Sequence, residues 1–454
     1  MLLVSFIFLE EREERGSDLN TGSDAQIEVR ECKISDLGKL VENRVRIRGW
    51  LYVKNTVGRI SFLRVRDSSG IVQVVVRREK VGEEVFEQVN KLKRESSLII
   101  EGVVRRDERA PGGVELGAES LRIQSPSLED YPLRRELSSN VVWKYRHLFI
   151  RSRIMNTVLK LRSSLSSIFR KWLLENDFYE VSAPSIVTAA TEGGAKMFEV
   201  KYFDKKAFLT QSSQFYLEGA IFSLEKVFCF QPSFRAEESK TRRHLSEYWH
   251  LEVEVSNMDF QGLLQIEEDM LTSVIEEFYN KHKEEIKRFN PGFKPFEKPF
   301  KKITYTQAVE LLRSNGVDIE WGKDLGVKEE RMVATIFGQP VFITHYPKQV
   351  RAFYHMPDPE NPSVVLSADL IVWPYGEITG GGQRIDDYRM LLERIVESGY
   401  NPEDYAWYLD LRKYGSVPHS GFGLGFERLL AHILHLPSIK YAIPYPRTQT
   451  IVYP

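Results

Sequence analysis

Acidic, basic and aromatic residues crowd into one short segment, residues 233–254, which reads SFRAEESKTRRHLSEYWHLEVE. Alternating residues on either side of ESKTRR predict the two strands of a hairpin, with Arg235 and Glu237 on one face and His244 and Tyr248 together on the return strand. Arg235 could neutralise two anions that must meet, such as a carboxylate that attacks a phosphate. Glu237 could accept a hydrogen bond from an amine, and Tyr248 could carry a flat heterocycle. A cross-strand ladder of ion pairs has the same spacing, so the pattern leaves both interpretations open.

Two glycine-rich segments nearer the carboxyl end carry further charged residues. In SADLIVWPYGEITGGGQRIDD, Asp369 and Glu377 flank a short strand-like run, followed by three glycines and Arg384. Two carboxylates beside glycines suit a Mg²⁺ ion bound through nucleotide phosphates. In GFGLGFERLLAHIL, glycines alternate along a predicted strand that leads into a helix with Arg428. This run matches neither the P-loop nor the GxGxxG fingerprint, because it lacks the GKS/T ending and the required spacing.

The elements that must position these residues begin with a long amphipathic helix. Apolar residues recur in it at helical spacing: Ile154, Val158, Leu161, Leu165, Ile168 and Leu173. The following NDFYEVSAPSI predicts a turn and then a strand that ends near Pro184. Such a helix–strand unit can build a core or a subunit interface.

The amino-terminal part of the chain predicts a small β-barrel with a basic face. Residues 45–80 contain nine lysines and arginines but two acidic residues, in strand-like runs separated by NTVG and DSSG turns. Alternation in SFLRVRD places Phe62 beside Arg64 and Arg66 on one face, which is typical of a stacking platform for an unpaired base. Gln73 could read a base edge. The pattern also fits a Phe62 that is covered by a loop and a Gln73 that is merely polar on an edge strand.

The composition is that of a globular protein of two or three domains, with 454 residues and a net charge of -1, so contact with nucleic acid must depend on a local patch. The cysteines, Cys32 and Cys229, form no disulfide framework or zinc pattern, which favours a reducing compartment, and we expect a cytoplasmic protein. No run is apolar for long enough to span a membrane. MLLVSFIFLEEREERG lacks the basic start and cleavage site of a signal peptide. The polar, turn-rich RGSDLNTGSDAQ follows, so residues 1–27 are expected to be a flexible extension or the result of a start codon placed too far upstream.

Three of these segments resemble a known family. FRAEESKTRRHLSEYW is similar to motif 2 of the class II aminoacyl-tRNA synthetases, and GFGLGFERL is similar to motif 3. The helix–strand segment that ends at Pro184 resembles motif 1, the dimer-forming element, and a barrel before the catalytic domain is typical of the aspartate/asparagine/lysine subgroup. The resemblance implies an α+β fold, in which an OB-fold β-barrel precedes an antiparallel-sheet class II catalytic domain. The expected boundaries are 1–27 for the extension, 28–126 for the OB-fold anticodon-binding domain, 127–148 for a linker and 149–454 for the catalytic domain.

The resemblance also implies a two-step reaction with ATP and Mg²⁺, in a homodimer that binds tRNA. The implied catalytic residues are Arg235, Glu237 and Arg428. Those implied to bind ATP are Arg235, Glu237, Arg243, His244, Leu245, Tyr248, Glu377, Ile378, Gly425 and Arg428. The amino acid would contact Glu192, Gln214, Glu218, Arg235 and Arg384. Mg²⁺ would be held by Asp369 and Glu377, and the anticodon would be read by Phe62 and Gln73.

The choice of amino acid depends on the run QSSQFYLE. Aspartate enzymes of the subgroup resemble QSPQLYK, whose lysine pairs with the substrate carboxylate, and here Leu217 takes the place of that lysine. Arg384 can hydrogen-bond the carbonyl oxygen that the side chains of aspartate and asparagine have in common. Glu218 can accept from an amide, directly or through water, and would repel a carboxylate. We therefore expect L-asparagine and tRNA(Asn) as substrates, giving AMP, pyrophosphate and Asn-tRNA(Asn), unless Glu218 is a surface carboxylate of a helix.

Three other functions remain compatible with these motifs. An aspartyl-tRNA synthetase with an altered pocket, possibly non-discriminating, would keep every motif above. An asparagine synthetase descended from this catalytic domain would be expected to lack the barrel. A catalytically inactive paralogue that only binds RNA would not need Arg235, Glu237, Glu377 and Arg428 together.

Overall fold

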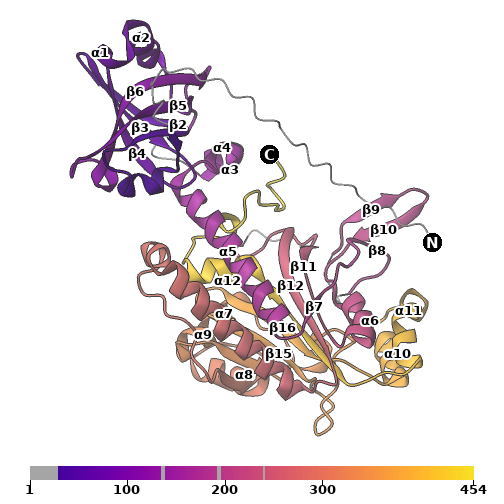
Figure 1. Cartoon of the computed structure of the whole chain (residues 1–454). Helices are drawn as coiled ribbons and strands as arrows, with labels where there is room; N and C mark the ends of the chain where they lie inside the picture. The colour runs from indigo at the N-terminus through magenta and orange to yellow at the C-terminus, as the bar shows by residue number, and fades with distance from the viewer. Residues whose placement is uncertain (1–28, 134–138, 192–195, 239–240) are drawn as a thin grey trace, which may run out of the picture. The chain divides into compact units, whose positions relative to one another are not determined.

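The computed structural model of the protein describes residues 29–133, 139–191, 196–238 and 241–454. The expected extension 1–27 and Glu192 lie outside these residues, as does part of the expected linker. The chain forms two compact units, Met1–Arg134 and Arg135–Pro454 (Figure 1). Short helices α3 (Ser139–Lys144) and α4 (Arg146–Phe149) begin the second unit.

The first unit is a closed β-barrel. Its strands are β1 (Arg30–Glu31), β2 (Arg44–Val57), β3 (Ile60–Arg66), β4 (Ile71–Arg77), β5 (Ser97–Arg106) and β6 (Val114–Ser125). They are ordered β1-β2-β3-β4-β6-β5, and β5 also pairs with β2, which closes the barrel. Helices α1 (Arg78–Val81) and α2 (Glu83–Lys91) lie between β4 and β5 along the chain. The OB-fold barrel predicted from short strands and turns is confirmed.

Alternation along β3 sorts its residues as predicted. Leu63 and Val65 are fully buried in the barrel core, whereas Phe62 is half-buried and Arg64 is exposed. Gln73 on β4 lies directly opposite Arg64, and Val75 lies opposite Phe62. Phe62 and Gln73 therefore belong to one outer face of the barrel.

The second unit is built on one large sheet. Its strands, in spatial order, are β13 (Lys301–Thr304), β14 (Val341–Thr344), β15 (Ser367–Val372), β16 (Gly376–Gln383), β17 (His419–Gly425), β12 (Glu247–Ser256), β11 (Lys226–Phe234) and β7 (Tyr179–Glu180). The inner pairs are antiparallel, as expected, while the outermost pair at each edge, β13–β14 and β11–β7, is parallel. A small separate sheet contains β8 (Ile186–Val187), β9 (Glu199–Tyr202) and β10 (Lys205–Leu209).

Helices cover this sheet and enclose its core. They are α5 (Arg153–Glu175), α6 (Gln214–Leu224), α7 (Phe260–Phe289), α8 (Tyr305–Ser314), α9 (Val327–Phe337), α10 (Tyr388–Glu397), α11 (Ala406–Lys413) and α12 (Phe426–Ile433). Short 3-10 helices occur in the chain at Ile34–Lys39, Pro111–Gly113, Lys348–Val350, Pro402–Tyr405 and Ile439–Tyr441. Apolar residues of α5, α7 and α12 share one core with β11, β12 and β17.

The helix predicted from residues 154–173 is α5. Ser152 caps it by accepting from the Met155 amide, and its apolar series from Val158 onward is buried. Ile154, the first member of the predicted series, is instead 56% exposed. Its neighbour in the first turn, Met155, is fully buried instead.

Candidate active site

The central strands of the large sheet are apolar on one face and polar on the other. Strand β12 sends Leu251 and Val253 into the core shared with α5 and α7. Its alternate residues face the opposite side, and they are Tyr248, His250, Glu252 and Glu254. The polar face is therefore a direct result of period-two alternation in β12.

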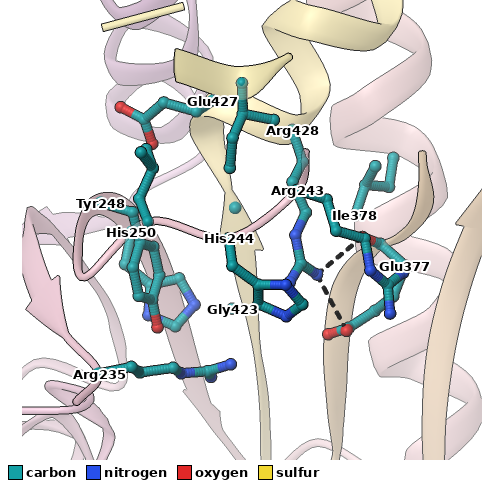
Figure 2. Close-up of a pocket in the computed structure, with 13 residues that line it drawn as sticks. Arg235, Arg243, His244, Tyr248, His250, Glu377, Ile378, Gly423, Glu427 and Arg428 are labelled. Atoms are coloured by element: carbon teal, nitrogen blue, oxygen red, sulfur yellow. Dashed lines mark hydrogen bonds and ion pairs between the residues drawn. The ribbon is translucent and has the colours of Figure 1, made fainter. Parts of the chain in front are cut away.

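Two pockets that share lining residues open on this polar face. The first contains nine of the ten residues implied to bind ATP, namely Arg235, Arg243, His244, Leu245, Tyr248, Glu377, Ile378, Gly425 and Arg428. Figure 2 shows how the side chains of this pocket lie around its centre. The second pocket contains Gln214, Asp369 and Arg384. Arg235, His250 and Glu377 line both pockets, so the two meet at these side chains.

The hairpin differs in one respect from its prediction. Strand β11 ends at Phe234 and β12 begins at Glu247, so Arg235, Glu237 and His244 lie in the connection and not on strand faces. The prediction that strand alternation places Arg235 with Glu237, and His244 with Tyr248, on common faces is therefore wrong. Arg235 is nevertheless fixed, because its amide donates to the Ser246 carbonyl at 3.0 Å and its guanidinium lies 5.4 Å from the Tyr248 ring centre.

Glu237 lies at the rim and His244 lies inside the first pocket. The Glu237 carboxylate oxygen is 4.0 Å from His244 Nε2, and its side chain is 37% exposed. Burial, followed by the guanidinium groups of Arg428, Arg243 and Arg235, lowers the pKa of His244 to about 4. His244 is consequently a neutral imidazole at pH 7.

Arg243 is held by an acidic residue from another helix. It forms a buried ion pair with Glu330 of α9, and Glu330 also accepts from the Glu377 amide at 3.1 Å. Sequence reasoning did not find Glu330, because it lies 87 residues from Arg243 and shows no pattern of its own.

Asp369 and Glu377 converge over a glycine. A side chain on Gly380 would place its Cβ 3.1 Å from Asp369 Oδ1 and 3.2 Å from Glu377 Oε1. Each carboxylate also has a basic partner: Asp369 pairs with Arg351, and Arg428 Nη1 lies 3.0 Å from Glu377 Oε2. Burial alone would raise the pKa of Glu377, but Arg428 and Arg235 outweigh it and hold that pKa well below its usual value.

The donor set fits a magnesium ion that is bound partly through phosphate. No group of three or more acidic, histidine or cysteine residues able to hold a metal occurs in the described part of the chain. Two convergent carboxylate oxygens next to a glycine leave the remaining positions of an octahedral ion to phosphate oxygens and water, which is how Mg²⁺ is commonly bound.

The second pocket has a wall of paired charges. Arg384 donates to Glu254 through Nε at 3.2 Å and through Nη2 at 2.5 Å, and both side chains are almost fully buried. Glu218 is fully buried behind Gln214, which excludes the alternative of a surface carboxylate. Leu217 is also fully buried, in an apolar cluster with Ile221, Val227 and Cys229, and it lies outside both pocket linings.

Among the residues of this face that sequence reasoning missed are His250 and Arg351. His250 lies at the junction of the pockets, and its place two residues after Tyr248 in β12 could have indicated it. Arg351 lies in the second pocket against the Tyr346 ring, at 3.6 Å from the ring centre. It directly follows the three-residue 3-10 helix Lys348–Val350, which is too short to give a periodic signal.

In the barrel, the candidate RNA-reading residues lie on the outer face. Gln73 Nε2 donates to Glu115 at 3.2 Å, and Phe62 is half-buried between its neighbours on β2 and β4. Trp50 on β2 is a further aromatic residue of this unit: it is 41% exposed, and the Arg66 guanidinium lies 5.1 Å from its ring.

Comparison with known proteins agrees with these two units. Residues 138–449 match the family model of the class II tRNA synthetases (D, K and N), and residues 45–124 match the OB-fold nucleic acid binding domain. The chain belongs to the class II tRNA synthetases of this group.

Within that group, the chain is similar over most of its length to asparagine enzymes. The chain is 48% identical to an asparagine–tRNA ligase of Pyrococcus furiosus, over 92% of this chain and 97% of that protein. It is 43% identical to that of Thermoplasma acidophilum, over 90% and 96%. The crystal structure of asparaginyl-tRNA synthetase from Pyrococcus horikoshii complexed with asparaginyl-adenylate matches with a TM-score of 0.90 and 46% identity, covering 94% of this chain and 100% of that one. The chain thus falls within the asparaginyl-tRNA synthetase family.

None of the helices in the described residues is both long enough and apolar enough to cross a membrane.

Proposed function

We propose that this protein activates L-asparagine with ATP and transfers the asparaginyl group to tRNA(Asn). The observation that carries this proposal is the position of Arg235 where two pockets meet, in a chain of this family. Two anions must be brought together at such a junction, and a guanidinium offers paired donors to both. The relatives named above are asparagine–tRNA ligases, and one was crystallised with asparaginyl-adenylate.

In the first step, a carboxylate oxygen of asparagine attacks the α-phosphorus of ATP, and pyrophosphate leaves. Arg235 bridges the carboxylate and the α-phosphate, and so offsets the repulsion between them. The adenine ring lies between Tyr248 and Arg428, and Glu237 at the rim accepts from its amine. Neutral His244 and Arg428 contact the outer phosphates.

Asp369 and Glu377 would hold Mg²⁺ together with phosphate oxygens. The ion would supply positive charge for the phosphates and the departing pyrophosphate. Arg351 and Arg428 restrain the two carboxylates through the ion pairs described above.

In the second step, a hydroxyl of the 3'-terminal adenosine of the tRNA attacks the carbonyl carbon of the adenylate, and AMP leaves. The outer face of the barrel, with Phe62 and Gln73, reads the anticodon by stacking and hydrogen bonding.

The enzyme acts as a homodimer in this proposal. Large apolar side chains are exposed along the segment that resembles motif 1. They are Ile154 and Leu174 of α5, Tyr179 of β7 and Ile186 of β8. A second copy of the chain would remove this surface from water.

ATP–pyrophosphate exchange with asparagine, with aspartate and with no amino acid tests the proposed function. We expect exchange with asparagine at a kcat/KM far above that for aspartate. Preference for aspartate would instead favour an aspartyl-tRNA synthetase, and no exchange with either would indicate an inactive protein. Free asparagine formed from aspartate and ammonia would favour an asparagine synthetase.

A further inference from the structure

Behind the second pocket, helices α6 and α11 enclose a buried group of polar side chains. The side chains of Glu218 and Arg412 are both fully buried, as are Tyr408 and His419. Gln214 connects this group to the pocket, because Gln214 lines the pocket and also bonds to Glu218.

One oxygen of Glu218 is fixed from three sides. Oε2 accepts from the Tyr408 hydroxyl at 2.7 Å and from Arg412 Nη2 at 2.5 Å, and His419 Nε2 lies 3.1 Å away. Arg412 is itself held, since its Nε donates to the Ile385 carbonyl at 2.8 Å. Burial would raise the pKa of Glu218, but Arg412 and His419 hold it well below its ordinary value. Glu218 is therefore an ionised carboxylate.

The other oxygen of Glu218 decides which way Gln214 points. Oε1 accepts from Gln214 Nε2 at 2.8 Å. An ionised carboxylate can only accept hydrogen bonds, so Gln214 must turn its NH₂ group toward Glu218. The amide carbonyl of Gln214 then points to the pocket, where it can accept from a substrate ammonium group.

We propose that Glu218 is a positioning residue that orients Gln214 toward the α-ammonium group of the amino acid, and not a direct contact of the side-chain amide. This inference rests on the proposed function. The sequence predicted that Glu218 contacts the side-chain amide of the substrate. In the structure, Oε1 could make that contact only if its hydrogen bond with Gln214 were broken. Specificity for the side chain then lies with other groups of the pocket, such as Arg384 and its partner Glu254.

The Glu218→Gln variant provides the first test. Its new amide can offer an NH₂ group to Gln214, which must then turn its own NH₂ toward the pocket and face the substrate ammonium with a donor. We expect the KM for asparagine in ATP–pyrophosphate exchange to rise about 10–100-fold, since a hydrogen bond to a charged group is lost, while kcat changes much less. An unchanged KM would overturn the inference.

Succinamic acid, which is asparagine without its α-amino group, separates the two possible roles of Glu218. It keeps the side-chain amide and the carboxylate, so its inhibition constant against asparagine should be within about twofold in wild type and Glu218→Gln. If its inhibition constant rises in parallel with the KM for asparagine, Glu218 acts on the side-chain amide and the inference is wrong.

The exchanged pair Gln214→Glu with Glu218→Gln should restore binding. In this double variant, the carboxylate at position 214 would accept from the amide NH₂ at position 218 with one oxygen and from the substrate ammonium with the other. The charge of the pair would be unchanged. We expect a KM within a few-fold of wild type. A KM as high as that of Glu218→Gln alone would contradict the inference.

Two controls separate these effects from misfolding and from a wrong function. Glu268 is also buried and accepts from a backbone amide, that of Phe300, but it lines neither pocket. Glu268→Gln should leave the KM for asparagine unchanged, and thermal melting of every variant reports loss of fold. If Glu218→Gln fails to fold, the exchanged pair alone decides the question. If wild type does not activate asparagine at all, it is the proposed function that fails.

Discussion

Arg235 is held on the sheet side by a backbone hydrogen bond and on the pocket side by an aromatic ring. Its guanidinium therefore occupies the junction before any substrate arrives. A group fixed in advance stabilises charge in the transition state without having to reorganise. Arg235 is held in place although it lies in a loop, because it directly follows the last residue of strand β11.

Replacing Arg235 by alanine should abolish adenylate formation and leave the fold intact. Loss of one preorganised donor at developing charge typically costs at least about a hundredfold in kcat. ATP–pyrophosphate exchange measures the loss, and the melting temperature should stay within a degree or two of wild type by the usual size of surface effects. Arg170→Ala removes a guanidinium of α5 that pairs with Glu180, away from both pockets, and should be fully active. Near-normal exchange in Arg235→Ala would remove this residue from the mechanism.

His244 should make stability depend on pH. Its folded pKa of about 4 lies below the ordinary value of 6.5. Between these values His244 binds a proton in the unfolded chain but not in the folded chain. The free energy of unfolding therefore falls as the pH drops from 6.5 to 4. His244→Gln should lose less stability in this window, by on the order of 1–3 kcal/mol. Urea unfolding at pH 7 and pH 4.5 measures the difference, with the exposed His147→Gln as the control expected to follow wild type. Identical pH dependence in His244→Gln and wild type would contradict this assignment.

Strand β16 carries two neighbouring glycines with different tasks. At Gly380 an added Cβ would meet only the carboxylate oxygens of Asp369 and Glu377. At Gly381 it would lie 2.5 Å from the Gly421 carbonyl oxygen, which belongs to the adjacent backbone. Gly380 therefore leaves room for the two carboxylates, whereas Gly381 allows β16 and β17 to lie close together.

Gly380→Ala should weaken magnesium use without loss of stability. The new methyl group would push the two carboxylates apart by a few tenths of an ångström, which matters for an ion that demands near-ideal geometry. The Mg²⁺ concentration for half-maximal exchange should rise several-fold, with little change in melting temperature. Gly381→Ala, the matched control, should instead lower the melting temperature, because backbone must move. If Gly380→Ala also melts early, the glycine is needed for packing.

The sequence predicted those parts of the site that depend on local order. The hairpin strands, the glycine-rich strands and the helix with Arg428 each follow from periodicity within some twenty residues. Contacts between distant segments could not be predicted in this way. Arg412 meets Glu218 across 194 residues of chain. Leu217, which the sequence placed at the pocket, faces an apolar cluster instead, because the direction of a side chain on a helix depends on what the helix packs against.

At the scale of the whole molecule, the barrel and the catalytic unit each have their own hydrophobic core. Each unit can therefore be altered without damage to the core of the other. Binding of RNA by one unit and chemistry in the other should be separable by mutation.

Phe62→Ala tests this separation. Loss of one stacked base should weaken tRNA charging by about 1–3 kcal/mol. ATP–pyrophosphate exchange without tRNA should not change. Leu63→Ala, one residue away but inside the barrel core, should lower barrel stability by about 2–5 kcal/mol. If Phe62→Ala lowers both activities together, Phe62 is a packing residue.

The proposed homodimer predicts that sedimentation equilibrium gives about twice the monomer mass of 52.7 kDa, down to nanomolar protein. Tyr179→Asp, which places a charge on the exposed apolar segment, should shift the protein toward monomer, while Tyr414→Asp, at another exposed tyrosine, should not. A monomer that remains fully active would contradict the dimer.

The buried ion pairs that line the second pocket and lie behind it also bear on how such a protein can change by mutation. Arg384 with Glu254, and Arg412 with Glu218, are each buried almost completely. Removal of one partner leaves the other as a buried charge without a counter-charge. This typically lowers the free energy of unfolding by about 3–5 kcal/mol, which is a large share of the stability of most domains. If the two residues of a pair are replaced one at a time, the protein with a single replacement is destabilised in this way. Each pair is thus inherited as a unit, and we expect a relative that differs at one member of a pair to differ at the other member as well.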